Sequence, residues 1–197
     1  MARHNWTSED IPDQAGKLVV VTGANSGLGY QTACALAGKG ARVVLAVRDE
    51  GKGRAAADAI RRAYSRAQLE VMALDLADLR SVRAFADTFR ARYDTLALLI
   101  NNAGVMALPY RRTVDSFEMQ FGTNHLGHFA LTGLLLPAIL AAPRARVVTV
   151  SSGVHTNARI DFDNLDGSKS YKPWRAYAQS KLANLLCAYE LQRLLVS

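Results

Sequence analysis

Short aliphatic runs and longer stretches of helical character alternate along the sequence. Five runs rich in Val, Leu and Ile predict strands, at residues 17–22, 41–47, 69–74, 96–100 and 146–151. Helices are expected between and after them, at about residues 26–37, 50–64, 79–92, 114–140 and 174–195. Such alternation is typical of a parallel sheet with helices on both faces. The sequence therefore predicts an α/β fold with a doubly wound parallel sheet.

The length of 197 residues and the hydrophobic content of 50% suit one domain with a sizeable core. We assign residues 17–197 to this domain and the polar residues 1–16 to an N-terminal extension, which has no apolar segment of the kind that marks a secretory signal. The longest apolar stretch, residues 129–142, contains Pro137 and suits a buried helix better than a membrane span. We expect a cytoplasmic protein without a membrane span.

Composition excludes several other classes of protein. Cys34 and Cys187 lack the close spacing of metal or redox pairs, so we interpret both as core thiols and expect no metal site. The formal net charge of +7 comes from arginines spread over several helices instead of one basic stripe. We therefore expect no nucleic-acid partner.

A glycine-rich turn follows the first predicted strand directly. Gly23 permits a tight turn, Gly27 lets a pyrophosphate approach the backbone, and Gly29 lets helix and strand pack closely. The N-terminus of the following helix would then meet the phosphate charge. The spacing Gly-x-x-x-Gly-x-Gly differs from Gly-x-Gly-x-x-Gly, and a strand-to-helix turn without a ligand is the alternative. The Rossmann-type dinucleotide fold is the interpretation that the flanking strand and helix favour.

Arg48 ends the second predicted strand, where dinucleotide enzymes place the residue that contacts the adenosine ribose. An arginine accommodates the 2′-phosphate of NADP, and Lys52 adds a second positive charge. The alternative is a surface Arg48, with Asp49 as the ligand of the ribose hydroxyl. We expect NADP(H), with NAD(H) as the second choice.

Tyr177 and Lys181 lie four residues apart in a predicted helix and therefore share one helix face. A nearby ammonium favours the phenolate and lowers the pKa of a tyrosine from about 10 toward neutrality. Such a phenol can serve as a general acid or base. A tyrosine and a lysine at this spacing also occur by chance in many helices, so the pair gains meaning from the other motifs.

Together these segments resemble the classical short-chain dehydrogenase/reductase family. The matching segments, in order, are 22–29, Asp75-Leu76, 101–104, Asn124, Ser151-Ser152 and 177–181. Within this family, the amino-acid sequence is most similar to the retinol dehydrogenase-like and WW-domain-oxidoreductase-like branch, as judged from residues 101–106, 123–129 and 177–184. The resemblance covers nearly the whole chain from Lys17 onward and implies a single dinucleotide-binding and catalytic domain at residues 17–197.

The resemblance implies a site residue by residue. Asp75 would contact the adenine, and residues 101–104 would line the cofactor floor. The implied cofactor-binding residues are Gly23, Asn25, Ser26, Gly27, Leu28, Gly29, Arg48, Asp75, Leu76, Asn102, Ala103, Gly104, Tyr177 and Lys181.

Four catalytic roles follow from the same resemblance. Tyr177 would give a proton to a carbonyl oxygen or take one from an alcohol, and Lys181 would lower the tyrosine pKa and hold the nicotinamide ribose. Ser152 would bind the substrate oxygen, with Ser151 as the weaker candidate, and Asn124 would hold a water that links Lys181 to solvent. The alternatives are a turn cap for Ser152 and a buried structural amide for Asn124.

Three histidines lie near these motifs. His125 and His128 have no carboxylate or cysteine partner at ligand spacing, which favours packing roles. His155 lies in the long irregular stretch 153–173, where it could face a substrate. Tyr171, Pro173 and Trp174 would either shape that pocket or pack at the entry to the last helix.

The expected function is the NADP-dependent interconversion of an alcohol and an aldehyde or ketone. Retinoids, steroids, lipid aldehydes and xenobiotic carbonyls all fit the resemblance, as does a homodimer formed by the helices that begin at Val114 and Trp174. Family members usually continue through strands six and seven, which are absent here, so we expect a C-terminally shortened fold. A truncated, noncatalytic dinucleotide-binding module is the alternative function.

Overall fold

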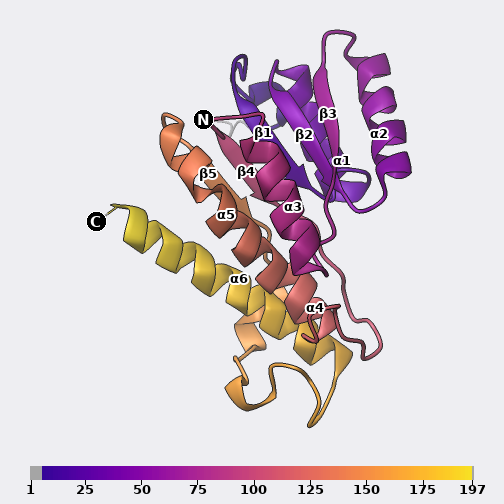
Figure 1. Cartoon of the computed structure of the whole chain (residues 1–197), viewed down its shortest axis with the longest axis vertical. Helices are drawn as coiled ribbons and strands as arrows, with labels where there is room; N and C mark the ends of the chain where they lie inside the picture. Colours follow the sequence, from indigo (N-terminus) through magenta and orange to yellow (C-terminus); the bar gives the residue numbers. More distant parts are fainter. Residues whose placement is uncertain (1–5, 197) are drawn as a thin grey trace, which may run out of the picture.

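A computed structural model describes residues 6–196 of the chain. Its five strands form one parallel sheet in the order β3-β2-β1-β4-β5 (Figure 1). The strands are β1 (Leu18–Thr22), β2 (Arg42–Val47), β3 (Gln68–Ala73), β4 (Leu98–Asn101) and β5 (Arg146–Thr149). The expected doubly wound α/β fold is confirmed, and every predicted strand is present with bounds within two residues.

Helices cover both faces of the sheet. They are α1 (Gly27–Gly38), α2 (Glu50–Ala63), α3 (Leu79–Arg90), α4 (Met119–Phe121), α5 (Gly127–Ala141) and α6 (Pro173–Val196). Alternate residues of β1 separate the two cores, because successive side chains of a strand point to opposite faces. Val19 and Val21 pack with α1 and α2, whereas Val20 packs with α3 and α5.

The helix expected at residues 114–140 begins later than the sequence indicates. Residues 114–118 form a loop, and the helical stretch consists of α4, a π-helical turn η2 (Gly122–Leu126) and α5. Glu118 starts it, since its carboxylate accepts hydrogen bonds from the backbone N–H groups of Gln120 (2.9 Å) and Phe121 (2.7 Å). This buried cap, which the apolar pattern does not reveal, fixes where the helix begins.

The whole helical stretch Met119–Ala141 has 23 residues, and an 18-residue window of it has a mean hydropathy of 1.2, enough to cross a membrane by length and composition alone. It is longer than the apolar run recognised in the sequence because it begins at Met119 instead of Phe129. Leu131, Leu135 and Ile139 belong to the core that α5 shares with the sheet. A core helix passes the same length and composition test, so the span is a weak candidate.

The strand order puts β1 beside β4, where the chain reverses its direction of travel across the sheet. In open α/β sheets, ligands bind at this point, outside the carboxyl ends of the strands. The glycine turn after β1 and residues 102–104 after β4 meet there. The topology therefore places the two halves of the predicted cofactor site against each other.

The segments at the margins of the domain are also ordered by contacts. In the extension, the 3₁₀ turn η1 (Ser8–Asp10) precedes Gln14, whose backbone N–H donates to the Lys39 carbonyl at 2.8 Å. Residues 1–5, part of the extension expected at 1–16, lie outside the described residues. The stretch 153–173 contains two 3₁₀ turns, η3 (Gly153–Asn157) and η4 (Phe162–Asn164), and leads into α6 below the sheet (Figure 1).

Candidate active site

The glycine turn has the backbone geometry that the sequence predicts. Gly23 has a φ of +66° and Gly27 a φ of +55°, a region that residues with a side chain rarely adopt. A Cβ atom on Gly29 would lie 2.4 Å from the carbonyl oxygen of Gly23 and 2.5 Å from Nδ2 of Asn102. Gly29 therefore allows α1 to pack directly against the turn, as expected for the third glycine.

Thr22 joins this turn to the loop after β4. Its Oγ1 accepts hydrogen bonds from the backbone N–H groups of Asn102 and Ala103, each at 2.9 Å. Its carbonyl oxygen accepts from Nδ2 of Asn102, also at 2.9 Å. Thr22 stands in the recognised motif, but its role becomes visible only when β1 and β4 lie side by side.

A cleft of about 470 Å³ opens at this junction. The predicted cofactor residues that line it are Gly23, Asn25, Ser26, Leu28, Arg48, Asp75, Leu76, Asn102, Ala103 and Gly104. Ser26 is the N-cap of α1 but makes no side-chain cap hydrogen bond, which leaves the N-terminal turn of α1 suited to an anion. Gly27 and Gly29 form the adjoining turn, and no atom within 4 Å would meet a Cβ on Gly27. This cleft fits the phosphates of a dinucleotide.

Arg48 and Asp49 have different positions relative to the cleft. Arg48 is exposed and lines it. Asp49 instead caps α2, since its Oδ1 accepts a hydrogen bond from the backbone N–H of Lys52 at 3.0 Å. Of the two alternatives for the ribose contact, this geometry favours Arg48.

Asp75 presents a carboxylate at the end of β3, on the wall of the cleft. Its Oδ1 accepts a hydrogen bond from the backbone N–H of Ala77 at 2.9 Å, and its own N–H donates to Oγ of Ser81 at 2.9 Å. Because these bonds fix both its side chain and its backbone, Asp75 is preorganised at the position implied for the adenine contact.

Asn124 is fully buried in the π-helical turn and connects three segments. Its Oδ1 accepts from the Val105 N–H at 2.8 Å, and its Nδ2 donates to the Val105 carbonyl (2.9 Å) and to Oγ of Ser180 (3.0 Å). Ser180 in turn donates to the carbonyl of Tyr177 at 2.7 Å. Three hydrogen bonds therefore hold the Asn124 side chain, and they place its peptide beside α6.

Lys181 and Tyr177 lie together on α6, as their spacing predicts. Nζ of Lys181 lies 5.7 Å from the centroid of the Tyr177 ring and donates to the Val150 carbonyl at 3.0 Å. Lys181 is 4% exposed, and burial lowers the pKa of its ammonium. Tyr177 is partly exposed and meets Trp174 edge-on, with ring centroids 6.1 Å apart.

Gly104 connects the cleft to this pair. A Cβ atom on Gly104 would lie 3.2 Å from Oδ1 of Asn124 and 3.7 Å from Nζ of Lys181. Gly104 also lines the dinucleotide cleft. The cofactor residues and the proposed proton-transfer residues therefore belong to one continuous site.

The two serines after β5 differ in their bonds. Oγ of Ser151 donates to the Lys181 carbonyl at 2.8 Å, which commits it to holding α6. Ser152 precedes η3 and makes no side-chain cap hydrogen bond, so the cap alternative does not hold for its hydroxyl. Its carbonyl accepts from Nδ1 of His155 at 2.7 Å. The geometry favours Ser152 over Ser151 for contact with a substrate.

Gln120 connects the irregular stretch 153–173 to the start of α6, the helix that carries Tyr177 and Lys181, a contact that the sequence did not indicate. It is fully buried, and its Oε1 accepts from the Ala107 N–H at 2.7 Å. Its Nε2 donates to the hydroxyl of Tyr171 (2.8 Å) and to the carbonyl of Pro173 (2.9 Å), where α6 begins. Gln120 therefore helps to set the position of α6.

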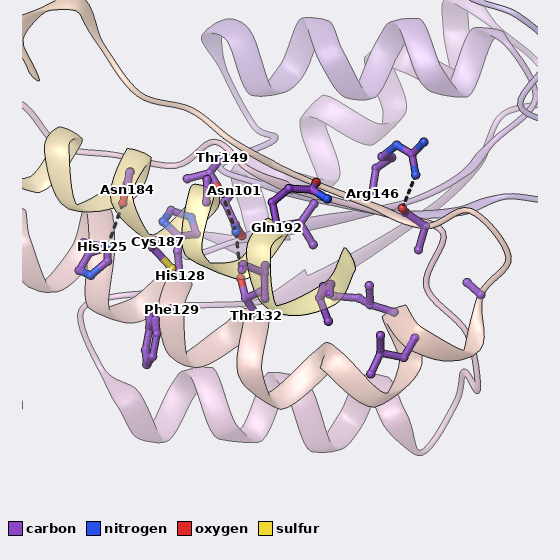
Figure 2. Close-up of a pocket in the computed structure, with 18 residues that line it drawn as sticks. Asn101, His125, His128, Phe129, Thr132, Arg146, Thr149, Asn184, Cys187 and Gln192 are labelled. Atoms are coloured by element: carbon purple, nitrogen blue, oxygen red, sulfur yellow. Dashed lines mark hydrogen bonds between the residues drawn. The ribbon is translucent and has the colours of Figure 1, made fainter. Parts of the chain in front are cut away.

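The histidines of α5 and its π-helical turn lie beside a hollow of about 290 Å³ between α5, α6 and β5 (Figure 2). His125 contacts Asn184 through Nδ1 at 3.2 Å, and burial lowers the pKa of its imidazole. Asn101 lies in the same hollow and donates to Thr132 at 3.0 Å. Among residues 6–196 no group of three or more His, Cys, Asp and Glu side chains could hold a metal ion.

Comparison with known proteins shows which sequences this chain is similar to. Residues 17–192 match the model of a family described as short chain dehydrogenase. The chain is 51% identical over 187 residues to mouse retinol dehydrogenase 12, covering 95% of this chain and 58% of that protein. It is 52% identical over 178 residues to human retinol dehydrogenase 11, covering 90% of this chain and 56% of that protein.

Solved structures share the fold. A crystal structure from Mycobacterium paratuberculosis has a TM-score of 0.86 and 55% identity, covering 97% of this chain and 67% of that chain. A Shigella flexneri structure complexed with NADP has a TM-score of 0.74 and 28% identity, covering 90% of this chain and 71% of that chain. The chain thus spans little more than half the length of the curated relatives that it matches.

Proposed function

Because the chain belongs to the short-chain dehydrogenase family, we propose that it is an NADP-dependent oxidoreductase that interconverts an alcohol and an aldehyde or ketone. One observation carries the proposal. Gly104 lies on the wall of the dinucleotide cleft and against both Asn124 and Lys181. A ligand in the cleft would therefore end beside the residues that move a proton.

The bound nicotinamide supplies the hydride chemistry. Tyr177 donates a proton to the carbonyl oxygen during reduction, or removes one from the alcohol during oxidation. Lys181 places its positive charge beside the Tyr177 ring, with Nζ 5.7 Å from the ring centroid, and would hold the nicotinamide ribose. The hydroxyl of Ser152 donates a second hydrogen bond to the oxygen on which negative charge develops. Asn124 orients its peptide toward a water that connects Lys181 with solvent.

Arg48 supports NADP(H) as the preferred cofactor. It lines the cleft as an exposed cation, whereas the carboxylate of Asp49 is engaged in capping α2. A guanidinium pairs well with a phosphate, and a structural relative was solved with NADP. Replacing Arg48→Gln should raise the Kd for NADPH about tenfold, the value of one charge-assisted hydrogen bond, with little effect on the Kd for NADH. Equal effects on both cofactors would favour NAD(H).

The substrate proposal follows from the named relatives, which are retinol dehydrogenases. We propose a long apolar alcohol or its aldehyde as the substrate, of which retinol is one example. The residues nearest to such a substrate would be Ser152, Tyr177 and Trp174, on the loop after β5 and on the first turns of α6.

A second candidate function is a noncatalytic dinucleotide-binding module. The observation behind it is the cleft itself, whose lining of Gly23, Arg48 and Asn102 would serve dinucleotide binding without any contribution from Tyr177. In that case the cleft binds NADPH, but Tyr177 turns over no substrate.

The assembly that we propose is a homodimer through α5 and α6. Phe129, Leu186 and Leu194 are 60%, 51% and 55% exposed, and they surround one apolar hollow of about 400 Å³. Pairing this face with a second copy would remove that apolar surface from water. We further propose a cytoplasmic location.

The experiment that tests the function is NADPH oxidation by the purified chain with a panel of aldehydes and ketones that includes retinal. Tyr177→Phe is the paired control, since it keeps the ring and removes only the hydroxyl. Turnover that disappears in the control supports the oxidoreductase. NADPH binding without turnover in either protein supports the binding module, and absence of binding contradicts both.

A further inference from the structure

His128 is a buried titratable group that the proposed reaction does not use. It lies on α5, is 2% exposed and forms part of the wall of the hollow between α5 and α6 (Figure 2). Both ring nitrogens make hydrogen bonds. Nδ1 lies 2.9 Å from the backbone carbonyl of Asn124, and Nε2 lies 2.9 Å from Oγ1 of Thr22.

The partners fix the tautomer of this ring. A backbone carbonyl only accepts hydrogen bonds, so Nδ1 carries the proton. Burial lowers the pKa of the imidazole to about 4, which keeps it neutral near pH 7 and leaves Nε2 as an acceptor. Thr22 must then donate its hydroxyl proton to Nε2, and the longer contact to the Ile100 carbonyl, at 3.4 Å, is the weaker alternative.

The direction of these bonds leaves the lone pairs of Thr22 free to accept. These lone pairs accept hydrogen bonds from the backbone N–H groups of Asn102 and Ala103, two residues that line the dinucleotide cleft. At the other end of the ring, Asn124 holds Val105 and Ser180 through its side chain. One imidazole therefore joins the cleft floor to the turn that positions α6.

We propose that His128 is a positioning residue that couples the floor of the dinucleotide cleft, through Thr22, to the peptide of Asn124. The coupling rests on the proposed function, because it assumes that the cleft binds a dinucleotide. The hydrogen-bonded chain itself does not depend on that assumption. His125, at the preceding turn, faces Asn184 instead and has no bond to the cleft.

The first test is spectroscopic and independent of ligand binding. Two-bond ¹H–¹⁵N spectra of the whole chain, labelled at histidine, report which ring nitrogen is protonated. We expect the neutral Nδ1–H form for His128 at pH 7, with no titration down to pH 5. Thr22→Val should keep this form, which the Asn124 carbonyl holds, and should shift the Nε2 resonance because its hydrogen-bond donor is lost. An Nε2–H form, or a charged ring above pH 5, would overturn the proposal even if the chain binds no NADPH.

The second test is a double-mutant cycle on the Kd for NADPH. His128→Phe should raise it about five- to tenfold, the loss of one connecting hydrogen bond. Thr22→Val, which also removes the acceptor of the Asn102 and Ala103 N–H groups, should raise it at least as much. The double variant should bind no more weakly than Thr22→Val alone, because the bond to His128 is already lost there. Additive effects would mean that the two residues act separately and would overturn the coupling.

Matched variants separate positioning from packing. His128→Asn, which can still donate to the Asn124 carbonyl, should bind NADPH more tightly than His128→Phe, and Thr22→Ser should bind like the unaltered chain. His125→Phe should leave the Kd for NADPH unchanged. If His128→Phe does not fold, the comparison of Thr22→Val with Thr22→Ser and the histidine spectra decide. If Thr22→Val binds NADPH with the same Kd as Thr22→Ser, the proposal is contradicted.

Discussion

A single missing methyl group allows the glycine turn to close on α1. At Gly29 a Cβ atom would lie 2.4 Å from a backbone oxygen, which cannot move without shifting β1 or the turn. Gly133, on the exposed side of α5, has no atom within 4 Å of such a position. A side chain is therefore sterically excluded at Gly29, whereas there is room for one at Gly133.

We predict that Gly29→Ala lowers the free energy of unfolding by about 1–3 kcal/mol, as overpacking does, and weakens NADPH binding. Gly133→Ala is the control and should raise the free energy of unfolding by about 0.5–1 kcal/mol, because alanine favours a helix. Urea unfolding of both variants provides the measurement. A neutral Gly29→Ala would mean that the turn is less tightly packed than the structure indicates.

The buried imidazole of His128 predicts a pH dependence of stability. Burial lowers its pKa from 6.5 to about 4, a trend that Lys181 and His125 reinforce and that the bond to Asn124 opposes. Between pH 6.5 and pH 4 the unfolded chain takes up a proton that the folded chain does not. The free energy of unfolding should therefore decrease as the pH is lowered from 6.5 to 4, by up to about 1.4 kcal/mol per pH unit from this group. Above pH 6.5 this group should contribute no pH dependence.

Urea unfolding across this pH range, with His128→Phe as the comparison, checks this dependence. The variant should show a flatter decline between pH 6.5 and pH 4. His125 and the carboxylates are present in both proteins, so their contributions cancel in the difference. Parallel curves would show that His128 is not held neutral in the folded chain.

At the scale of elements, the position of α6 relative to the loop after β4 depends on Gln120 of α4. Its amide makes three hydrogen bonds, to Ala107, Tyr171 and Pro173, and is fully buried. An amide with this set of partners holds the loop after β4 and the first turn of α6 at fixed positions. The position of Tyr177 on α6 therefore depends on a residue of α4.

We predict that Gln120→Met lowers the free energy of unfolding by about 1–3 kcal/mol, because it leaves buried polar groups without partners. Amide hydrogen exchange should accelerate at Ala107 and through residues 165–173. Tyr171→Phe, which removes one hydroxyl and leaves the bonds of Gln120 to Ala107 and Pro173, should have a smaller effect. Equal effects of the two variants would show that Tyr171, and not Gln120, connects the elements.

At the scale of the whole molecule, α1 and α2 cover one face of the sheet, and α3 and α5 cover the other (Figure 1). Helix α6 lies beside β5, which is an edge strand of the sheet. The outer surfaces of α5 and α6 carry apolar side chains that are about half exposed or more. Large apolar surfaces of this kind commonly mark interfaces. The proposed dimer follows from this arrangement.

We predict a dimer at micromolar concentration in sedimentation and a monomer for Leu186→Glu, since a carboxylate in the interface would lose its hydration. Val114→Glu, at an exposed apolar position outside α5 and α6, should remain dimeric. A monomeric unaltered chain would contradict the proposed assembly.

The sequence by itself determined the order of elements, the glycine turn and the spacing of Tyr177 and Lys181. These are local features, since strand and helix periods, tight turns and the faces of a helix depend on neighbouring residues. The family followed from the same local motifs, and the matching family model confirms it. Glu118 shows the limit, because a buried cap moved the helix start to Met119.

Tertiary structure alone decided which polar groups meet. Thr22 and His128 are 106 positions apart, and Gln120 and Pro173 are 53 apart, so no local period reveals either pair. The strand order brings β1 beside β4 and thereby turns separate motifs into one cleft. Hydrogen bonds then favoured one of the alternatives that the residue types left open, because the side chains of Ser151 and Asp49 bond to backbone groups, whereas Ser152 makes no cap bond and Arg48 lines the cleft.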